Sequence, residues 1–233
     1  DSQGLPTSTP SSLPITKNFT GSYSAKVLVQ EITPSSGNPG TLTFPDKLIY
    51  SSGVSPQSVE ATYGEVGSLK LGGVAAGNYL IAKNDIPFYT QGHIGRFYPK
   101  YLEVSDTAPT NNCIATDFNY LGKPDSAIKY TLTAKNTQGK TTRNYESSKY
   151  VALAKDTHLS LNGENADSGV SLKNSIKTKK STFSWKQGAA STSWTYELTK
   201  NIEPQYPYNS FVLSLEGTGP DNVPLSPLNV WPG

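Results

Sequence analysis

Few residues in this chain could perform nucleophilic or metal chemistry. It contains two histidines, His93 and His158, and one cysteine, Cys113, widely separated in the sequence. A zinc site needs several such ligands near one another, and a catalytic thiolate needs a neighbouring base. With so few ligands at this spacing, the sequence predicts no zinc site and no cysteine nucleophile.

Cys113 has three interpretations on sequence grounds. A single cysteine cannot form an internal disulfide. Cys113 is therefore a small buried apolar residue, a residue whose disulfide partner belongs to another part of a longer chain, or a reactive thiol. The first two interpretations are favoured, because a reactive thiolate needs a neighbouring base and the sequence places none beside it.

Oxygen ligands for calcium gather in an expected loop at 162–167. Carboxylate and amide side chains alternate there with small residues, and hard oxygen ligands at such spacing can bind Ca²⁺. A solvated turn has the same composition, and the glycine and acidic positions of an EF-hand loop are missing. No metal ligand is therefore assigned. The residues concerned are Asn162, Glu164, Asn165 and Asp167.

Sequence signatures of known enzyme classes are missing. No glycine-rich phosphate loop opens a helix, and no Gly-x-Ser-x-Gly elbow occurs. A glycosidase needs only two carboxylates, but the 18 acidic residues are scattered through turns and give no preferred pair. We therefore expect no enzyme, and assign no catalytic residue, no cofactor-binding residue and no cofactor.

Aromatic residues cluster in the last fifty positions and suggest either a glycan site or a core. Exposed rings stack on the apolar faces of sugars, whereas buried rings fill β-sandwich cores. Alternation over 194–198 places three apolar side chains on one strand face, which favours the core. The cluster consists of Trp185, Trp194, Tyr196, Tyr206, Tyr208 and Trp231.

A run of lysines precedes and follows position 180. The favoured interpretation is a solvated loop and an edge strand, because lysine discourages pairing between sheet edges. The other interpretation is an anionic-surface contact. The run consists of Lys173, Lys177, Lys179, Lys180 and Lys186.

Composition places the chain among extracytoplasmic all-β proteins. Charged residues make up 16% and hydrophobic residues 35%, both low for a cytoplasmic enzyme, and the rest is rich in Ser, Thr, Asn, Gly and Pro. A net charge of +2 does not suggest nucleic acid as a partner. No apolar run approaches the roughly 18–20 residues that span a membrane. Because it lacks Met, the chain is expected to be part of a longer protein.

Alternation and turn residues predict two β-modules after an extended arm. Residues 1–18 are rich in Pro, Ser and Thr without periodicity, which indicates an arm or linker. Residues 19–95 are expected to form a first module with strands at 19–32, 41–44, 47–50, 59–71 and 77–81. In the strand at 19–32, Val27 and Val29 share one face and Leu28 lies on the other. A break is expected at Gly64.

Residues 96–233 are expected to form the second module. A hairpin is predicted over 128–145, with alternate residues Tyr130, Leu132 and Ala134 facing the core and a turn at 136–139. Gly122 is expected to supply a turn conformation that other residues avoid. The two strands of this hairpin are expected at 127–136 and 140–146. Further strands are expected at 97–105, 115–121, 149–154, 157–161, 180–187, 192–200 and 208–216, and a short helix at 168–175.

Several of these stretches recur together in one family. The chain resembles the large C-terminal region of MshQ-like proteins, which are encoded with the mannose-sensitive haemagglutinin class of type IV pili. The resemblance covers about Tyr23 to Leu225. It departs near the end, where an Asp-rich Asp-x-Asp-Gly-Val stretch is represented only by Asp221 and Val223. The stretches are Ala61–Leu71, Gly95-Arg96-Phe97-Tyr98-Pro99, Phe118-x-Tyr120-x-Gly122-x-Pro124, Tyr130–Asn136 and Asn144-Tyr145.

The resemblance implies a secreted, pilus-associated protein without assigned biochemistry. Together with composition, it predicts two immunoglobulin-like β-sandwich modules in tandem and a non-catalytic extracellular adhesion module at the cell surface. Expected partners are other pilus or surface proteins, glycans or a neighbouring copy, with no nucleic acid and no membrane insertion. One alternative is a self-assembling filament subunit whose arm adds a strand to a neighbour. Another is a glycan-binding module or a glycoside-acting enzyme.

Overall fold

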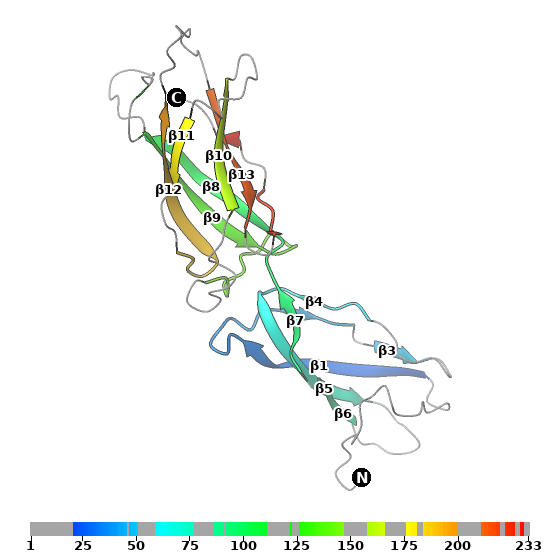
Figure 1. Cartoon of the computed structure of the whole chain (residues 1–233). Helices are drawn as coiled ribbons and strands as arrows, with labels where there is room; N and C mark the ends of the chain where they lie inside the picture. Colours follow the sequence, from blue (N-terminus) through cyan, green and yellow to red (C-terminus); the bar gives the residue numbers. More distant parts are fainter. Residues whose placement is uncertain are drawn as a thin grey trace. The chain divides into compact units, whose positions relative to one another are not determined.

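The computed structural model contains β-strands and no α-helix in the part of the chain that it describes (Figure 1). The all-β fold class predicted from the sequence is confirmed for these residues. None of the described segments is a helix long and apolar enough to cross a membrane. The described residues are 21–45, 47–50, 59–76, 86–90, 92–110, 122, 126–146, 158–165, 176–180, 184–199, 211–219, 222–226 and 229–230.

The chain divides into two compact units, and the second is discontinuous in sequence. The first unit comprises Asp1–Glu31, Thr41–Tyr63 and Leu69–Ile94. The second comprises Gly95–Gly233 together with two short upstream segments, Ile32–Gly40 and Gly64–Ser68. The predicted limits of two sandwich modules at 19–95 and 96–233 stay a prediction.

The first unit is built on a sheet of antiparallel strands. Its strands follow the order β3-β1-β5-β6, and a separate short pair is formed by β2 and β4. Residues 26–30 alternate, with Val27 and Val29 half-buried and Leu28 exposed, as predicted. The strands are β1 (Gly21–Thr33), β2 (Leu42–Thr43), β3 (Lys47–Tyr50), β4 (Thr62–Tyr63), β5 (Gly67–Ala76) and β6 (Ile86–Tyr89); β7 (Ile94–Phe97) follows them.

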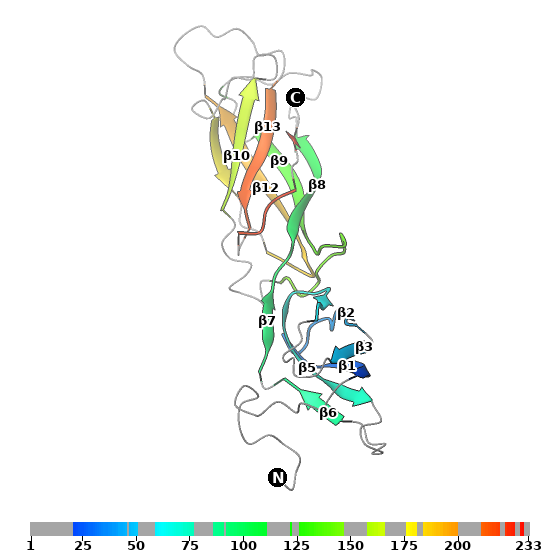
Figure 2. The same ribbon diagram turned by 90° about the vertical axis from the view of Figure 1, so that its right-hand side faces the viewer.

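The second unit contains two sheets. One has the strand order β11-β12-β9-β8 and the other the order β10-β13-β14. Both views show β10 beside β13 along their length (Figure 1 and Figure 2), and their register runs from His158 opposite Thr218 to Asn165 opposite Phe211. The strands are β8 (Tyr101–Thr110), β9 (Ser126–Lys135), β10 (His158–Asn165), β11 (Ile176–Lys180), β12 (Ala189–Leu198), β13 (Phe211–Thr218) and β14 (Asn229–Val230).

Both sheets contribute to one core. In β9 the residues Tyr130, Leu132 and Ala134 are buried, which confirms the predicted inward face. In β12 the buried residues Trp194, Tyr196 and Leu198 also share one face, as predicted. Period-two alternation gives this result because successive side chains of a strand point to opposite faces. From the other sheet the same core receives Leu161, Leu213 and Leu215.

The predicted second strand of the hairpin, 140–146, is wrong. Thr141 bridges back to Lys135 and the Thr142 N–H donates to the Ala134 carbonyl, but residues 142–146 form no strand. The turn itself is as expected. The Asn136 side-chain oxygen accepts hydrogen bonds from the Gln138 and Lys140 N–H groups, and Gly139 has a φ of 74°.

Other expected strands also differ from the structure. The expected strand at 97–105 is divided, because β7 ends at Phe97 and β8 begins at Tyr101. The expected strand at 180–187 is replaced by β11, which ends at Lys180, and by a tight turn joining Lys186 to Ala189. The expected strand at 59–71 is split into β4 and β5, with the predicted break at Gly64. The expected loop at 162–167 begins as strand, because β10 continues to Asn165. Outside the described residues lie the arm, the strands at 77–81, 115–121 and 149–154, the helix at 168–175, and Cys113.

Candidate functional site

A cluster of buried polar side chains is the feature of the second unit with the most organised chemistry. Glu65, Thr142, Asn144 and Glu146 are all buried, with exposed fractions of 8% or less. Buried carboxylates are rare unless their charge is met by hydrogen bonds or by an opposite charge. The partners of each group therefore decide whether the cluster is structural or chemically available.

The Glu65 carboxylate is held by main-chain donors. Its Oε1 accepts hydrogen bonds from the Val66 N–H at 2.9 Å and the Asn144 N–H at 3.1 Å. Its Oε2 accepts one from the Arg143 N–H at 2.9 Å. Burial raises the pKa of the Glu65 carboxyl, while the bonds from the Val66, Asn144 and Arg143 N–H groups act in the opposite direction. The carboxylate thus joins two segments that are 79 residues apart.

The side-chain amide of Asn144 joins a third segment to the same place. Its Oδ1 accepts a hydrogen bond from the Asn38 N–H at 2.6 Å, and its Nδ2 donates to the Asn38 carbonyl at 2.9 Å. A longer contact of 3.4 Å runs from Nδ2 to the Val66 carbonyl. Asn144 therefore satisfies main-chain groups from both upstream segments of the second unit.

Glu146 and Thr142 fix the loop that carries Asn144. The Glu146 Oε1 accepts a hydrogen bond from the Gln187 N–H at 3.0 Å. The Thr142 hydroxyl donates to the Ala134 carbonyl at 3.2 Å, at the end of β9. Gly188, with a φ of 80°, packs so closely that a Cβ there would lie 2.4 Å from the Thr142 carbonyl oxygen. The loop and the turn at 186–189 are thus locked together.

The aromatic residues singled out from the sequence lie in the core wherever they are described. Trp185, Trp194 and Tyr196 are buried, which favours their interpretation as core residues over a sugar-stacking surface. Trp185 meets Tyr145 edge to face with ring centres 4.6 Å apart. Tyr206, Tyr208 and Trp231 lie outside the described residues.

A buried polar pair crosses the sheet between β9 and β12. The Trp194 Nε1–H donates a hydrogen bond to the Tyr130 hydroxyl. Burial raises the pKa of the Tyr130 phenol, and the bond from Trp194 acts against that rise. The pair satisfies two polar groups that would otherwise be buried without partners, so its role is structural.

The calcium candidate takes a different form from the one expected. Asn162, Glu164 and Asn165 lie in strand β10 instead of a ligand loop, and Asp167 is outside the described residues. The Asn162 Nδ2 donates to the Glu216 carboxylate at 2.5 Å across the strand pair. In the described part of the chain no group of three or more His, Cys, Asp or Glu side chains could hold a metal ion.

Val223, one of the two residues shared with the Asp-rich family pattern, is a buried core residue near the end of β13. The Gly219 N–H donates to the Val223 carbonyl at 2.7 Å, and Thr218 bridges to Pro224. Val223 is 1% exposed and belongs to the core. Asp221, the other residue shared with the family pattern, lies outside the described residues.

The lysine run lies partly on a strand at the edge of its described sheet. Lys177 and Lys179 are exposed on β11, which is the outermost described strand beside β12. Lys186 is exposed in the turn before β12, and Lys180 ends β11. Lys173 is outside the described residues. The interpretation as an edge strand and a solvated loop agrees with the exposure of Lys177, Lys179 and Lys186.

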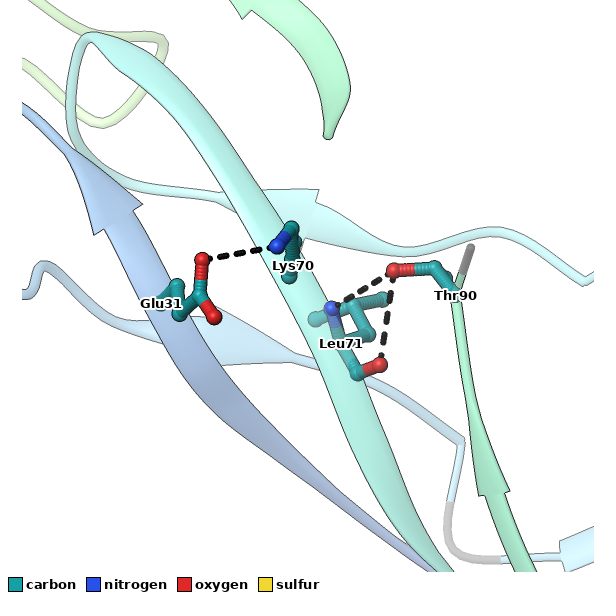
Figure 3. Close-up of polar contacts among 4 residues, drawn as sticks. All are labelled: Glu31, Lys70, Leu71 and Thr90. Atoms are coloured by element: carbon teal, nitrogen blue, oxygen red, sulfur yellow. Dashed lines mark hydrogen bonds and ion pairs between the residues drawn. The ribbon is translucent and has the colours of Figure 1, made fainter. Parts of the chain in front are cut away.

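Polar contacts of the first unit fasten its strands and lie near its surface. Lys70 on β5 forms a 2.9 Å ion pair with Glu31 on β1 (Figure 3), and the bond from Lys70 lowers the pKa of the Glu31 carboxyl. The Thr90 hydroxyl accepts a hydrogen bond from the Leu71 N–H at 3.1 Å and contacts the Leu71 carbonyl at 3.4 Å. These contacts cross between strands and organise no buried site.

Sequence reasoning missed the role of Glu65, Asn144 and Glu146. Glu65 and the Asn144-Tyr145 pair stand within the stretches that carry the family resemblance, but no pattern linked them to each other. The one available signal was their membership of those stretches, to which Glu65, Asn144 and also Gly122 belong. The structure confirms the predicted turn role of Gly122, whose φ is 76° and whose N–H donates to the Leu198 carbonyl at 2.6 Å.

A comparison with protein families places the chain in one family. The family described as DUF6701, third domain, matches residues 65–230, and the chain belongs to this family. The match begins at the carboxylate that organises the buried cluster. A search of curated proteins found no match, and neither did a search of solved structures.

Proposed function

We propose that this chain is a non-catalytic extracellular adhesion module of MshQ-like type, associated with pili or with the cell surface. Its finer architecture is proposed to be two immunoglobulin-like β-sandwich modules in tandem. Its partners are other pilus or surface proteins, and glycans are a further class of ligand. The chain's strand-rich fold and its Ser-, Thr- and Asn-rich composition support this proposal.

The proposal rests mainly on one observation: the buried carboxylates accept hydrogen bonds from main-chain N–H groups. A general acid or a nucleophilic carboxylate must reach its substrate. Glu65 is 4% exposed and Glu146 is 8% exposed, and both accept main-chain hydrogen bonds. The most organised acidic groups therefore maintain the fold, as expected of a scaffold that presents its loops and edges to partners.

The first experiment locates the protein and measures attachment. Surface labelling of producing cells, with immunogold imaging of their pili, should place the chain outside the cell. A strain lacking it should keep its pili and attach several-fold less well to host cells or abiotic surfaces. Confinement of the chain to the cytoplasm, or unchanged attachment with the chain removed, would overturn the proposal.

Two other functions are outcomes of further measurements. The size of the purified protein, with and without residues 1–18, tests the filament-subunit alternative, in which the arm adds a strand to a neighbour. A monomer in both forms, at 25.0 kDa for the whole chain and correspondingly less without the arm, would exclude it. Release of reducing sugar from common polysaccharides would instead indicate a glycoside-acting enzyme and contradict the non-catalytic role.

A further inference from the structure

The segment Ile32–Gly40, called the strap below, belongs to the second unit although it precedes β2 in sequence. It is folded by a turn in which the Gly37 N–H donates to the Pro34 carbonyl at 2.9 Å. All nine of its residues are half-buried or exposed, and none is buried. The strap therefore contributes little apolar burial to the unit it joins.

The residues that receive the strap are, in contrast, buried and hydrogen-bonded to one another. Asn144 is 2% exposed and Val66 is 1% exposed. The Asn144 N–H donates a hydrogen bond to the Glu65 carboxylate, and neither residue belongs to the strap. The Asn144 amide is thus positioned by groups that do not belong to the strap.

Asn144 contacts the main chain of the strap. It bonds both the N–H and the carbonyl of Asn38, which is how a neighbouring β-strand would pair with that residue. The Asn38 side chain bonds within the strap itself: its Oδ1 accepts a hydrogen bond from the Gly40 N–H at 3.2 Å. The site accordingly recognises a short piece of main chain.

Close approach requires glycine beside the bonded residue. A Cβ added at Gly37 would lie 2.6 Å from the Asn144 Oδ1 and 2.9 Å from its Cγ. Real Cβ atoms do not approach so closely, and the Asn144 amide cannot retreat without breaking its bonds to Asn38 and Val66. Glycine at 37 is needed here for space, since it gives the amide room to reach the main chain.

We propose that the strap is a detachable element and that the Asn144 amide is its latch. An exposed segment held by a preformed site can open locally while the core stays folded. Opening frees the last two residues of β1 and the chain that follows them as far as Gly40, and it uncovers a site for main-chain N–H and carbonyl groups. The inference rests on the geometry of the second unit and is independent of the adhesive role.

Hydrogen exchange followed by mass spectrometry on the full chain tests the latch with one substitution in the strap and one in the site that holds it. Gly37→Ala alters the strap, and Asn144→Asp removes the amide donor and adds a charge beside Glu65. The matched control is Gly92→Ala, where an added Cβ meets nothing within 4 Å. A second control, Asn38→Ala, keeps the main-chain groups that the latch bonds.

The expected result is faster exchange confined to the strap. In Gly37→Ala and Asn144→Asp, peptides covering 32–40 should exchange on the order of tenfold faster or more, while peptides covering β9 stay protected. Both controls should match the wild type over β9, and Gly92→Ala should match it over the strap as well. If Asn144→Asp fails to fold, Gly37→Ala decides.

Two results would overturn the proposal. Unchanged exchange of the strap in Gly37→Ala would show that the amide does not hold it. Equal loss of protection over the strap and β9 would show that the strap is an inseparable part of the core.

Discussion

Glu65 shows how a single buried side chain can stabilise a loop by accepting main-chain hydrogen bonds. Replacing it by alanine leaves the Val66, Arg143 and Asn144 N–H groups without their acceptor. We expect Glu65→Ala to lower the free energy of unfolding of the second unit by about 2–4 kcal/mol, because buried unsatisfied donors are costly. Urea unfolding followed by the fluorescence of the buried Trp185 and Trp194 measures this loss.

The matched control for that substitution is Glu103, a glutamate on β8 of the same unit. Glu103 pairs with Lys135 at 3.1 Å and is 44% exposed. Glu103→Ala should change stability by less than about 1 kcal/mol, as is usual for surface ion pairs. Equal losses in the two variants would show that the main-chain bonds of Glu65 add nothing beyond an ordinary surface contact.

The pKa of Glu65 gives a pH dependence of defined sign. Burial raises this pKa above its ordinary value of 4.5 in the folded protein. The folded state then binds the proton more tightly than the unfolded state, so this group's stabilising contribution is present at low pH. That contribution is lost as pH rises through the folded pKa.

A comparison with a variant that cannot titrate isolates this effect. The stability difference between the wild type and Glu65→Gln should shift in favour of the wild type as pH falls from about 8 toward the ordinary pKa. Urea unfolding of both proteins across this range measures the difference. A difference that is constant, or that shifts toward Glu65→Gln as pH falls, would mean that burial does not dominate the pKa.

At the scale of elements, β9 contributes several buried residues to the core, and substitutions on its two faces can test which face points inward. Leu132 is fully buried and Thr131, the next residue, lies on the other face, where its hydroxyl is 3.1 Å from that of Ser191. Leu132→Ala should cost about 2–5 kcal/mol through the cavity it leaves. Thr131→Ala, on the same strand, should cost no more than about 1 kcal/mol. Similar melting temperatures for the two variants would contradict the inward face.

The elements that sequence predicted best are those in which the core decides the pattern. In β9 and β12 apolar residues recur at every second position, because one face of each strand is covered by the other sheet. That pattern is local and can be found without knowing any partner. The turn at 136–139 was also predicted, since glycine and asparagine supply its conformation and its side-chain bonds.

The segment 140–146 was predicted wrongly because its partners are distant in sequence. Thr142 and Asn144 alternate like a strand, and both are buried. They are buried because they bond the Ala134 carbonyl, the upstream residue Asn38 and the segment at Glu65. Nothing in the local pattern distinguishes a polar side chain that bonds a remote segment from one that faces water.

At the scale of the whole molecule, the buried apolar residues that the structure describes lie mainly in the second unit. Among the described residues, the core cluster lies in the second unit and draws on β8, β9, β10, β12 and β13. Leu69 is the buried hydrophobic residue described in the first unit, while Leu28 on β1 is 51% exposed. Burial of apolar surface provides most of the stability of a fold.

We therefore expect the first unit to unfold before the second. Pulsed hydrogen exchange at increasing urea should show peptides from β1 and β5 losing protection at a lower concentration than peptides from β9 and β12. Leu69→Ala should move the first transition and leave the second, since Leu69 lies outside the shared core. Leu132→Ala should act on the second transition. A single transition at which all four strands lose protection together would show instead that the units fold as one cooperative body, whatever their separate cores contain.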